Sequence, residues 1–192
     1  MAHPGKKLLF MGQEFAQREE WDYQTQLDWS LLQYADHQAM LAYTQKLNRF
    51  YVENAPLWEN DDSWEGFHWI ANDDYRQSVI AFRRIDDKGD ELIIVCNFVP
   101  VERENYCIGV PQKGRYKVVF HSDAAEFGGT GNAKASVTAK AVPMHGLPQS
   151  ISLTLAPMSV MYLKPMPVKP RAKPDNADTA AAGRGQSKKH TK

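Results

Sequence analysis

The chain has 192 residues, and its 23 basic and 23 acidic side chains give a formal net charge of zero. The charges are unevenly placed. From Pro165 onward there are seven Lys or Arg and only two Asp, so acidic residues outnumber basic ones before that point. An acidic body argues against a nucleic-acid-binding protein, and no apolar run approaches the roughly 18 residues of a membrane span.

The first predicted element is a strand at Lys7–Met11, because KLLFM is a continuous apolar run. Short runs of this kind fit a strand that is buried on both faces of a parallel sheet. The following stretch, Gln13–Leu32, is rich in aromatic and acidic residues without a clean period, so a long structured loop is predicted there.

A helix is predicted over Asp36–Asn54, with Asp36 as its cap and Pro56 as its stop. Its apolar residues recur at helical spacing, and they are Met40, Tyr43, Leu47, Phe50 and Tyr51. Strand, loop and helix together form one β/α unit. One such unit cannot bury its own strand, which indicates that neighbouring units are missing from the sequence.

From Pro56 the pattern changes to short β-rich runs separated by turn residues. Six strands are predicted, at Ser78–Ile85, Glu91–Phe98, Asn105–Val110, Arg115–His121, Ser150–Leu155 and Ser159–Leu163. The connection 86–90 contains Gly and is typical of a hairpin. In 150–155, apolar and hydroxyl residues alternate, which indicates a half-buried antiparallel strand. This half is predicted to be an all-β sandwich or barrel of about 100 residues.

Several features of this half have plain structural interpretations. Cys96 ends an apolar run and is expected to be a buried reduced thiol. The glycine-rich segment 128–132 lacks the Lys-Ser/Thr pair of a phosphate-binding loop, so a flexible hairpin tip is predicted. No histidine has a partner at metal-ligand spacing, so no metal site is predicted. Residues 165–192 are predicted to be a disordered basic tail, with a contact for acidic partners as the alternative.

The amino-terminal residues carry a resemblance to a known family. The run GKKLLFMGQEFAQ at 5–17, then Glu20-Trp21 and Leu27-Asp28-Trp29, is very similar to a stretch of glycogen branching enzymes of the α-amylase superfamily. The resemblance covers about residues 1–164. It implies an α+β fragment: the last β/α unit of a (β/α)8 barrel in 1–55, a carboxy-terminal all-β antiparallel sandwich domain in 56–164, and the disordered tail.

The resemblance also implies where substrate would bind. In a (β/α)8 barrel, the loops at the carboxyl ends of the strands build the active site. Sites for sugars combine aromatic platforms with carboxylates, so the expected substrate contacts are Glu14, Trp21, Asp28 and Trp29. Each has a structural alternative. Glu14 could pair with an arginine elsewhere in the barrel, Trp29 could pack the loop down, and Asp28 could be a loop-shaping hydrogen-bond acceptor.

The family reaction is a retaining double displacement that breaks an α-1,4 bond and forms an α-1,6 branch without a cofactor. Its catalytic carboxylates come from earlier barrel strands, and none of those motifs is present here. No catalytic and no metal-binding residue is therefore predicted, and the chain alone is expected to be inactive. The expected partners are an α-glucan such as glycogen and the missing amino-terminal part of the barrel. No nucleic acid and no membrane is expected, and the expected location is the cytoplasm.

Two other functions remain open at this point. The β half could be a non-catalytic glucan-binding module that uses exposed aromatic residues such as Trp58, Trp64 and Trp69. The chain could also come from another enzyme of the superfamily, such as a trehalose-releasing hydrolase, although the position of Leu27-Asp28-Trp29 favours a branching enzyme. In either case, the first 55 or so residues are expected to be poorly held in isolation, whereas the β domain is expected to fold alone.

Overall fold

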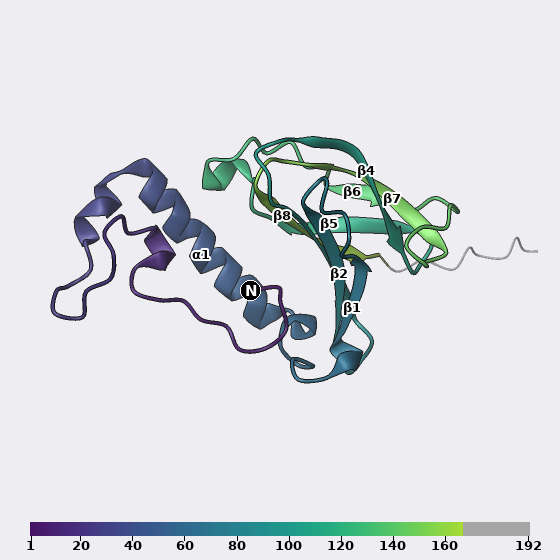
Figure 1. Cartoon of the computed structure of the whole chain (residues 1–192), viewed down its shortest axis with the longest axis horizontal. Helices are drawn as coiled ribbons and strands as arrows, with labels where there is room; N and C mark the ends of the chain where they lie inside the picture. The colour runs from purple at the N-terminus through teal and green to yellow at the C-terminus, as the bar shows by residue number, and fades with distance from the viewer. Residues whose placement is uncertain (167–192) are drawn as a thin grey trace, which may run out of the picture.

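The computed structural model describes residues 1–166, which form a β sandwich with one long helix packed against its outer face (Figure 1). The regular elements in chain order are η1 Gln13–Phe15, η2 Trp29–Gln33, α1 Ala35–Glu53, η3 Ala55–Leu57, η4 Trp64–Gly66, β1 Phe67–Ala71, β2 Val79–Ile85, β3 Glu91–Asn97, β4 Arg103–Val110, β5 Arg115–His121, η5 Ala125–Phe127, β6 Ser136–Thr138, β7 Gln149–Leu155 and β8 Ser159–Pro165, where η denotes a 3-10 helix.

The β half consists of two antiparallel sheets. The larger sheet has the strand order β1-β2-β3-β8-β5-β6, and the smaller sheet pairs β4 with β7. Their facing sides share one apolar core, to which Ile93 and Leu163 contribute from the large sheet and Ile108 and Ile151 from the small one. The predicted all-β antiparallel architecture is therefore confirmed.

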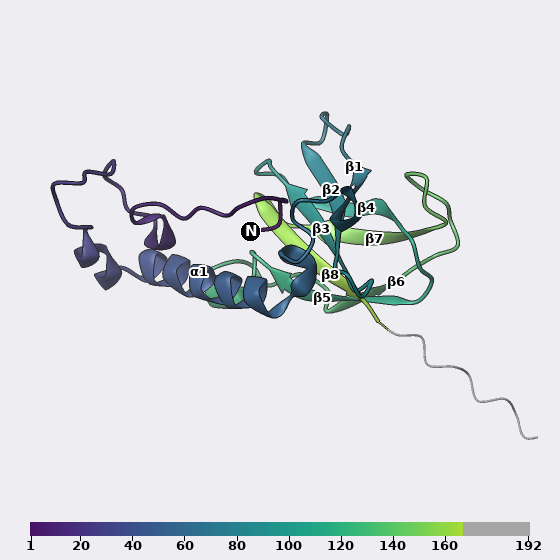
Figure 2. The same cartoon turned by 90° about the horizontal axis from the view of Figure 1, so that it is seen from below.

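The carboxy-terminal half of helix α1 packs on the opposite face of the large sheet (Figures 1 and 2). Phe50 lies with its ring centroid 5.1 Å from those of both Phe120 and Tyr162. Strand β3 is buried on both faces, because Leu92 and Ile94 point to the helix while their neighbours point to the other sheet. This explains why the sequence of β3 is a continuous apolar run rather than an alternating one.

Most of the predicted elements are confirmed to within two residues. The helix predicted at Asp36–Asn54 is α1, but Asp36 does not cap it. The N-cap position is Tyr34, which makes no side-chain cap hydrogen bond, and Asp36 lies in the first turn, where its charge still favours the helix dipole. The sequence analysis missed β1 and the three-residue β6 as strands. Strand β8 also includes Pro165, the first residue of the predicted tail.

The strand predicted at Lys7–Met11 is not formed. This segment has no strand partner among residues 1–166, and Leu8 is 79% exposed. The reason is physical: a parallel strand needs neighbours on its edges to satisfy its backbone groups, and the described chain supplies none there. The segment instead runs alongside α1, as both views show (Figures 1 and 2).

The glycine-rich segment 128–132 connects β5 with β6, so its position in a hairpin connection is confirmed. It is held from one side by Asp123, whose carboxylate accepts from the Thr130 amide at 3.0 Å and whose carbonyl accepts from the Gly131 amide at 2.8 Å. The predicted disordered tail lies outside the described residues from position 167 onward. In the described part, no helix is both long and apolar enough to cross a membrane.

Candidate functional site

The four predicted substrate contacts all lie, in sequence, between the unpaired segment 7–11 and helix α1. Glu14 is the middle residue of η1, Trp21 lies on the loop between the two 3-10 helices, and Asp28 and Trp29 begin η2. We call residues 12–33 the site loop. The sequence analysis placed these residues on one long structured loop, and the structure agrees.

The site loop begins with a turn that requires glycine. Gly12 has φ of 86°, and a Cβ on it would stand 2.8 Å from the Cβ of Gln17. The Gln17 amide donates to the Gly12 carbonyl at 3.0 Å, and the Gln17 side-chain carbonyl accepts from the Asp28 amide at 3.0 Å. Gln17 therefore ties the start of the site loop to its end.

A buried contact fixes the loop to the helix. The carbonyl of Phe15 accepts a hydrogen bond from Nδ1 of His37 on α1 at 2.7 Å, and both residues are buried. Trp29 lies against Phe15 with ring centroids 5.0 Å apart, and its other side faces solvent. The sequence analysis missed His37, although an isolated histidine among the helical residues was a signal that could have been followed.

Trp21 and the other three candidates face different surroundings. Trp21 packs edge-on against Phe10, with centroids 5.4 Å apart, and lines an open groove of about 550 Å³. Glu20 and Met40 also line this groove, whereas Glu14, Asp28 and Trp29 are not among its lining residues. The structure thus brings Trp21 together with an apolar wall and a carboxylate, but it does not gather all four candidates around one cavity.

The side chains of Asp28 and Glu14 differ in their hydrogen bonding. One carboxylate oxygen of Asp28 accepts from the Ser30 amide at 3.2 Å and from the Ser30 hydroxyl, which shapes the start of η2. Glu14 is partly exposed and makes no side-chain hydrogen bond or ion pair with residues 1–166. Its carboxylate is therefore available to a ligand or to a partner segment.

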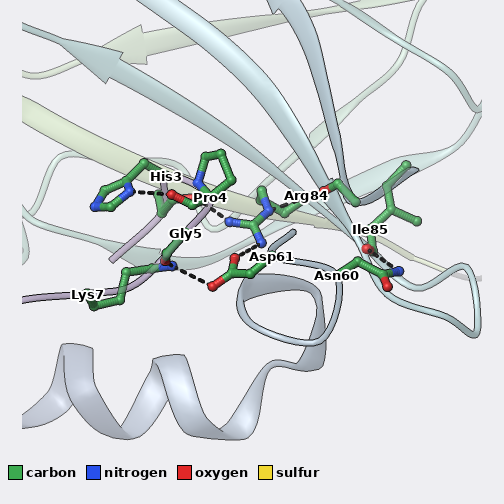
Figure 3. Close-up of polar contacts among 10 residues, drawn as sticks. His3, Pro4, Gly5, Lys7, Asn60, Asp61, Arg84 and Ile85 are labelled. Atoms are coloured by element: carbon green, nitrogen blue, oxygen red, sulfur yellow. Dashed lines mark hydrogen bonds and ion pairs between the residues drawn. The ribbon is translucent and has the colours of Figure 1, made fainter. Parts of the chain in front are cut away.

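A second polar cluster joins the amino terminus to the β domain (Figure 3). Fully buried Arg84 donates from Nη1 to the Ala2 carbonyl at 3.0 Å, from Nε to the Gly66 carbonyl at 3.2 Å, and from Nη2 to Asp61 at 2.5 Å. The other oxygen of Asp61 accepts from Lys7 at 3.0 Å. We call these contacts the Arg84 network.

Electrostatics in the Arg84 network favour the charged carboxylate. Burial by itself raises the pKa of Asp61, but the hydrogen bonds and charges of Arg84 and Lys7 outweigh burial, so the pKa lies below its ordinary value. The sequence analysis missed this network. A signal was present, since Arg84 is two residues from Phe82 in β2 and so shares its inward face.

The site loop offers aromatic faces and acceptors but no metal-binding group. Among residues 1–166, no three His, Cys, Asp or Glu side chains lie close enough to hold a metal ion. Half-exposed Trp21 and Trp29 can stack on an apolar ring face, and the Glu14 carboxylate can accept hydroxyl hydrogens. These groups have the chemistry of a sugar contact, but they do not line one cavity.

Comparison with known proteins identifies relatives that match most of the chain. The 1,4-alpha-glucan branching enzyme of Halothermothrix orenii is 46% identical over 168 residues, which is 86% of this chain and 27% of the relative. That of Aquifex aeolicus is 47% identical over 165 residues, 85% of this chain and 26% of the relative. The solved structure of the Group B Streptococcus pullulanase SAP covers 72% of this chain and 18% of that chain, at 21% identity and a TM-score of 0.45.

The chain spans about a quarter of the length of these curated relatives. A family model described as "Alpha amylase, C-terminal all-beta domain" matches residues 69–166, which is just over half of the sequence. That range contains most of β1 and all of β2 to β8 of the two-sheet sandwich. The chain therefore belongs to the family of alpha amylase C-terminal all-beta domains.

Proposed function

We propose that this chain is the carboxy-terminal part of a 1,4-α-glucan branching enzyme. The observation that carries the proposal is the identity of 46–47% over 85–86% of the chain. The matched length is too great to fit into residues 69–166 alone, so the similarity includes α1 as well as the β domain. The relatives are branching enzymes, which favours this function over that of a trehalose-releasing hydrolase.

In this proposal, residues 1–55 are the last strand, loop and helix of a (β/α)8 barrel, and residues 56–164 are the domain that follows it. The state of the segment 7–11 supports this assignment. It forms no strand, and Leu8, Leu9 and Phe10 are all exposed although they are apolar. Neighbouring barrel strands would satisfy the backbone and bury these side chains.

The reaction of such an enzyme is retaining: a carboxylate forms a covalent glycosyl intermediate, and a sugar hydroxyl then accepts the glucan. This chain contributes substrate contacts and no reacting group. Trp21 and Trp29 would stack on sugar faces, Glu14 would accept hydroxyl hydrogen bonds, and Asp28 would hold the start of η2 in place. The two partners are therefore the α-glucan and the remaining barrel, and the chain alone is inactive.

The proposal includes a cytoplasmic location. Cys96 and Cys107 are free thiols, as expected in a reducing compartment. Burial raises the pKa of Cys96 to about 11, so this thiol, which is partly rather than fully buried, stays protonated.

A chimaera tests the proposal. The carboxy-terminal quarter of the Aquifex aeolicus branching enzyme is replaced by this chain, and α-1,6 branch points formed on linear amylose are counted after debranching. We expect branching by the chimaera and none by the 192-residue chain alone. In the chimaera, Glu14→Gln should reduce turnover about tenfold or more. The matched control Glu53→Gln, on the exposed end of α1, should leave turnover unchanged. A folded chimaera without branching activity would overturn the proposal.

A further inference from the structure

His37 is a buried polar side chain in the first turn of α1, and one of its ring nitrogens contacts the site loop. Its Nδ1 lies 2.7 Å from the carbonyl oxygen of Phe15, a residue that is fully buried. A carbonyl oxygen can only accept, so the hydrogen of this bond is on Nδ1. The contact therefore requires an imidazole that carries a hydrogen on this nitrogen.

The accepting carbonyl belongs to the peptide bond between Phe15 and Ala16, at the end of η1. Ala16 has φ of 58°, in the left-handed region that a residue with a Cβ seldom adopts. The Ala16 amide donates to the Gln13 carbonyl at 3.2 Å. A conformation of this kind persists only where its surroundings hold it. Here the peptide is held on both sides, by the Gln13 carbonyl and by His37.

The same contact controls the position of two candidate substrate contacts. Glu14 lies directly before Phe15, so its backbone is held between the Gly12 turn and the bonded peptide. Trp29 packs on the Phe15 ring, with centroids 5.0 Å apart. Helix α1 itself is attached to the large sheet through its carboxy-terminal half. Loss of the His37 bond should therefore free the site loop without detaching the helix.

We propose that His37 is a positioning residue of the branching reaction. By holding the Phe15 carbonyl, it keeps Glu14 and Trp29 in place for the glucan. The role in the reaction rests on the proposed function. The bond does not, because both of its partners belong to this chain and are buried in it. A buried, hydrogen-bonded histidine can also serve stability alone, and the following experiments separate the two roles.

Two substitutions of His37 differ in where they place a donor. The side-chain amide nitrogen of asparagine can take the position of Nδ1, whereas the longer glutamine places its amide nitrogen near the position of Nε2. We therefore expect His37→Asn to keep the bond to the Phe15 carbonyl and His37→Gln to lose it. The matched control is His68→Gln, at an exposed position in β1.

Trypsin cleavage after Arg18 in the 192-residue chain measures whether the site loop is held. Arg18 follows Phe15 closely in the sequence, and its guanidinium lies 5.9 Å from the centre of the Tyr34 ring. Cleavage there needs local opening of the loop. We expect His37→Gln to raise the cleavage rate about tenfold, and His37→Asn and the control to change it by less than about twofold. Near-UV circular dichroism checks that each variant is folded.

A measurement on the wild type keeps the proposal testable if a variant does not fold. Nitrogen-15 chemical shifts of the imidazole, measured by NMR at about pH 8, show which ring nitrogen carries the hydrogen when an ordinary histidine is neutral. We expect the hydrogen of His37 on Nδ1, protected from exchange with water. A hydrogen on Nε2 alone would overturn the proposal, because Nδ1 could not then donate to the Phe15 carbonyl.

The chimaera tests the role in the reaction, with kcat and KM measured on linear amylose. We expect His37→Gln to lower kcat/KM about tenfold and His37→Asn to stay within about twofold of the wild type. If His37 acts through Glu14, the double variant His37→Gln/Glu14→Gln should lose much less than the product of the two single losses. A histidine that serves stability alone would give losses that multiply.

Three outcomes would overturn the proposal: an unchanged cleavage rate in His37→Gln, the same behaviour of His37→Asn and His37→Gln, or losses that multiply in the double variant. An inactive chimaera with the wild-type chain would overturn the proposed function and, with it, the role in the reaction. Cleavage and NMR would still decide whether His37 holds the site loop. An active chimaera that His37→Gln leaves fully active would overturn only the positioning role.

Discussion

Arg84 is a fully buried cation, and each of its three guanidinium nitrogens donates to a different acceptor. The acceptors belong to distant parts of the chain: Ala2 at the amino terminus, and Asp61 and Gly66 before β1. An arginine suits this position because its planar fork of donors matches several acceptors at once, which a lysine does not. Arg84 thus holds the amino terminus and the connection between α1 and β1 on the β domain.

Removing this cation should be costly. We expect Arg84→Met to lower the free energy of unfolding by about 3–5 kcal/mol, because Asp61 and two carbonyls lose their partner in a buried place. Urea unfolding followed by fluorescence measures the loss. The control Arg76→Met, at an exposed position, should change stability by less than about 0.5 kcal/mol. An Arg84→Met chain as stable as the control would show that the network does not contribute.

The same network should make stability depend on pH. The pKa of Asp61 is lowered in the folded chain, so its ionised form stabilises the fold above the unfolded value of 3.8, and this contribution is lost as pH falls through the folded pKa. We therefore expect wild type to be more stable than Asp61→Asn at pH 7 and the difference to shrink below pH 3.8. Unfolding at several pH values measures it. A difference that stays constant down to pH 2 would contradict the prediction.

Helix α1 contacts both the site loop and the large sheet. Its amino-terminal half holds the site loop through His37, and its carboxy-terminal half packs on the large sheet through Leu47, Phe50 and Tyr51. Any shift of the helix on the sheet therefore moves the site loop as well. This gives the β domain a physical connection to the candidate site, which lies outside the domain itself.

The packing of α1 can be measured with two substitutions on the same helix. Phe50→Ala should lower the free energy of unfolding by about 2–4 kcal/mol, because it removes a ring that contacts Phe120 and Tyr162. Val52→Ala, two residues further along on the exposed side, should change it by less than about 0.5 kcal/mol. Thermal and urea unfolding provide both values. Equal effects would mean that the helix does not depend on the sheet.

At the scale of the whole molecule, the first 55 residues do not behave as one unit in the structure. The site loop is mostly exposed, whereas Ala2 and the second half of α1 share a core with the large sheet. The expectation of a poorly held amino-terminal third therefore applies best to the site loop. The segment 7–11 runs next to the helix, which is itself attached to the β domain (Figures 1 and 2).

Limited proteolysis with trypsin tests this division. Within residues 1–166, we expect the first cleavage after Arg18 in the exposed site loop, because cleavage needs a locally unfolded chain. Sites at Lys46 and Arg49 on α1 should be cut much later. Mass spectrometry of the fragments over time gives the order. Early cleavage within α1 would show that the helix is not held on the sheet.

The sequence by itself determined most of the elements. Hydrophobic period, turn residues and the apolar run of β3 indicated six strands, the helix and the all-β class, because these signals depend on residues that are close along the chain. The resemblance at residues 5–29 likewise located the site loop from neighbouring residues alone. The same local signals predicted a strand at Lys7–Met11 that does not form, since a strand needs partners that residues 1–166 do not supply there.

Only the tertiary structure decided the polar contacts and the packing of α1. Arg84 bonds Ala2 across 82 positions of sequence, and His37 bonds Phe15 across 22. Neither pair follows from period or composition, because each forms only when the fold brings a buried donor to an otherwise unsatisfied carbonyl. The sequence likewise predicted the candidate residues of the site loop. It could not predict what each of them packs against, because those contacts depend on the fold.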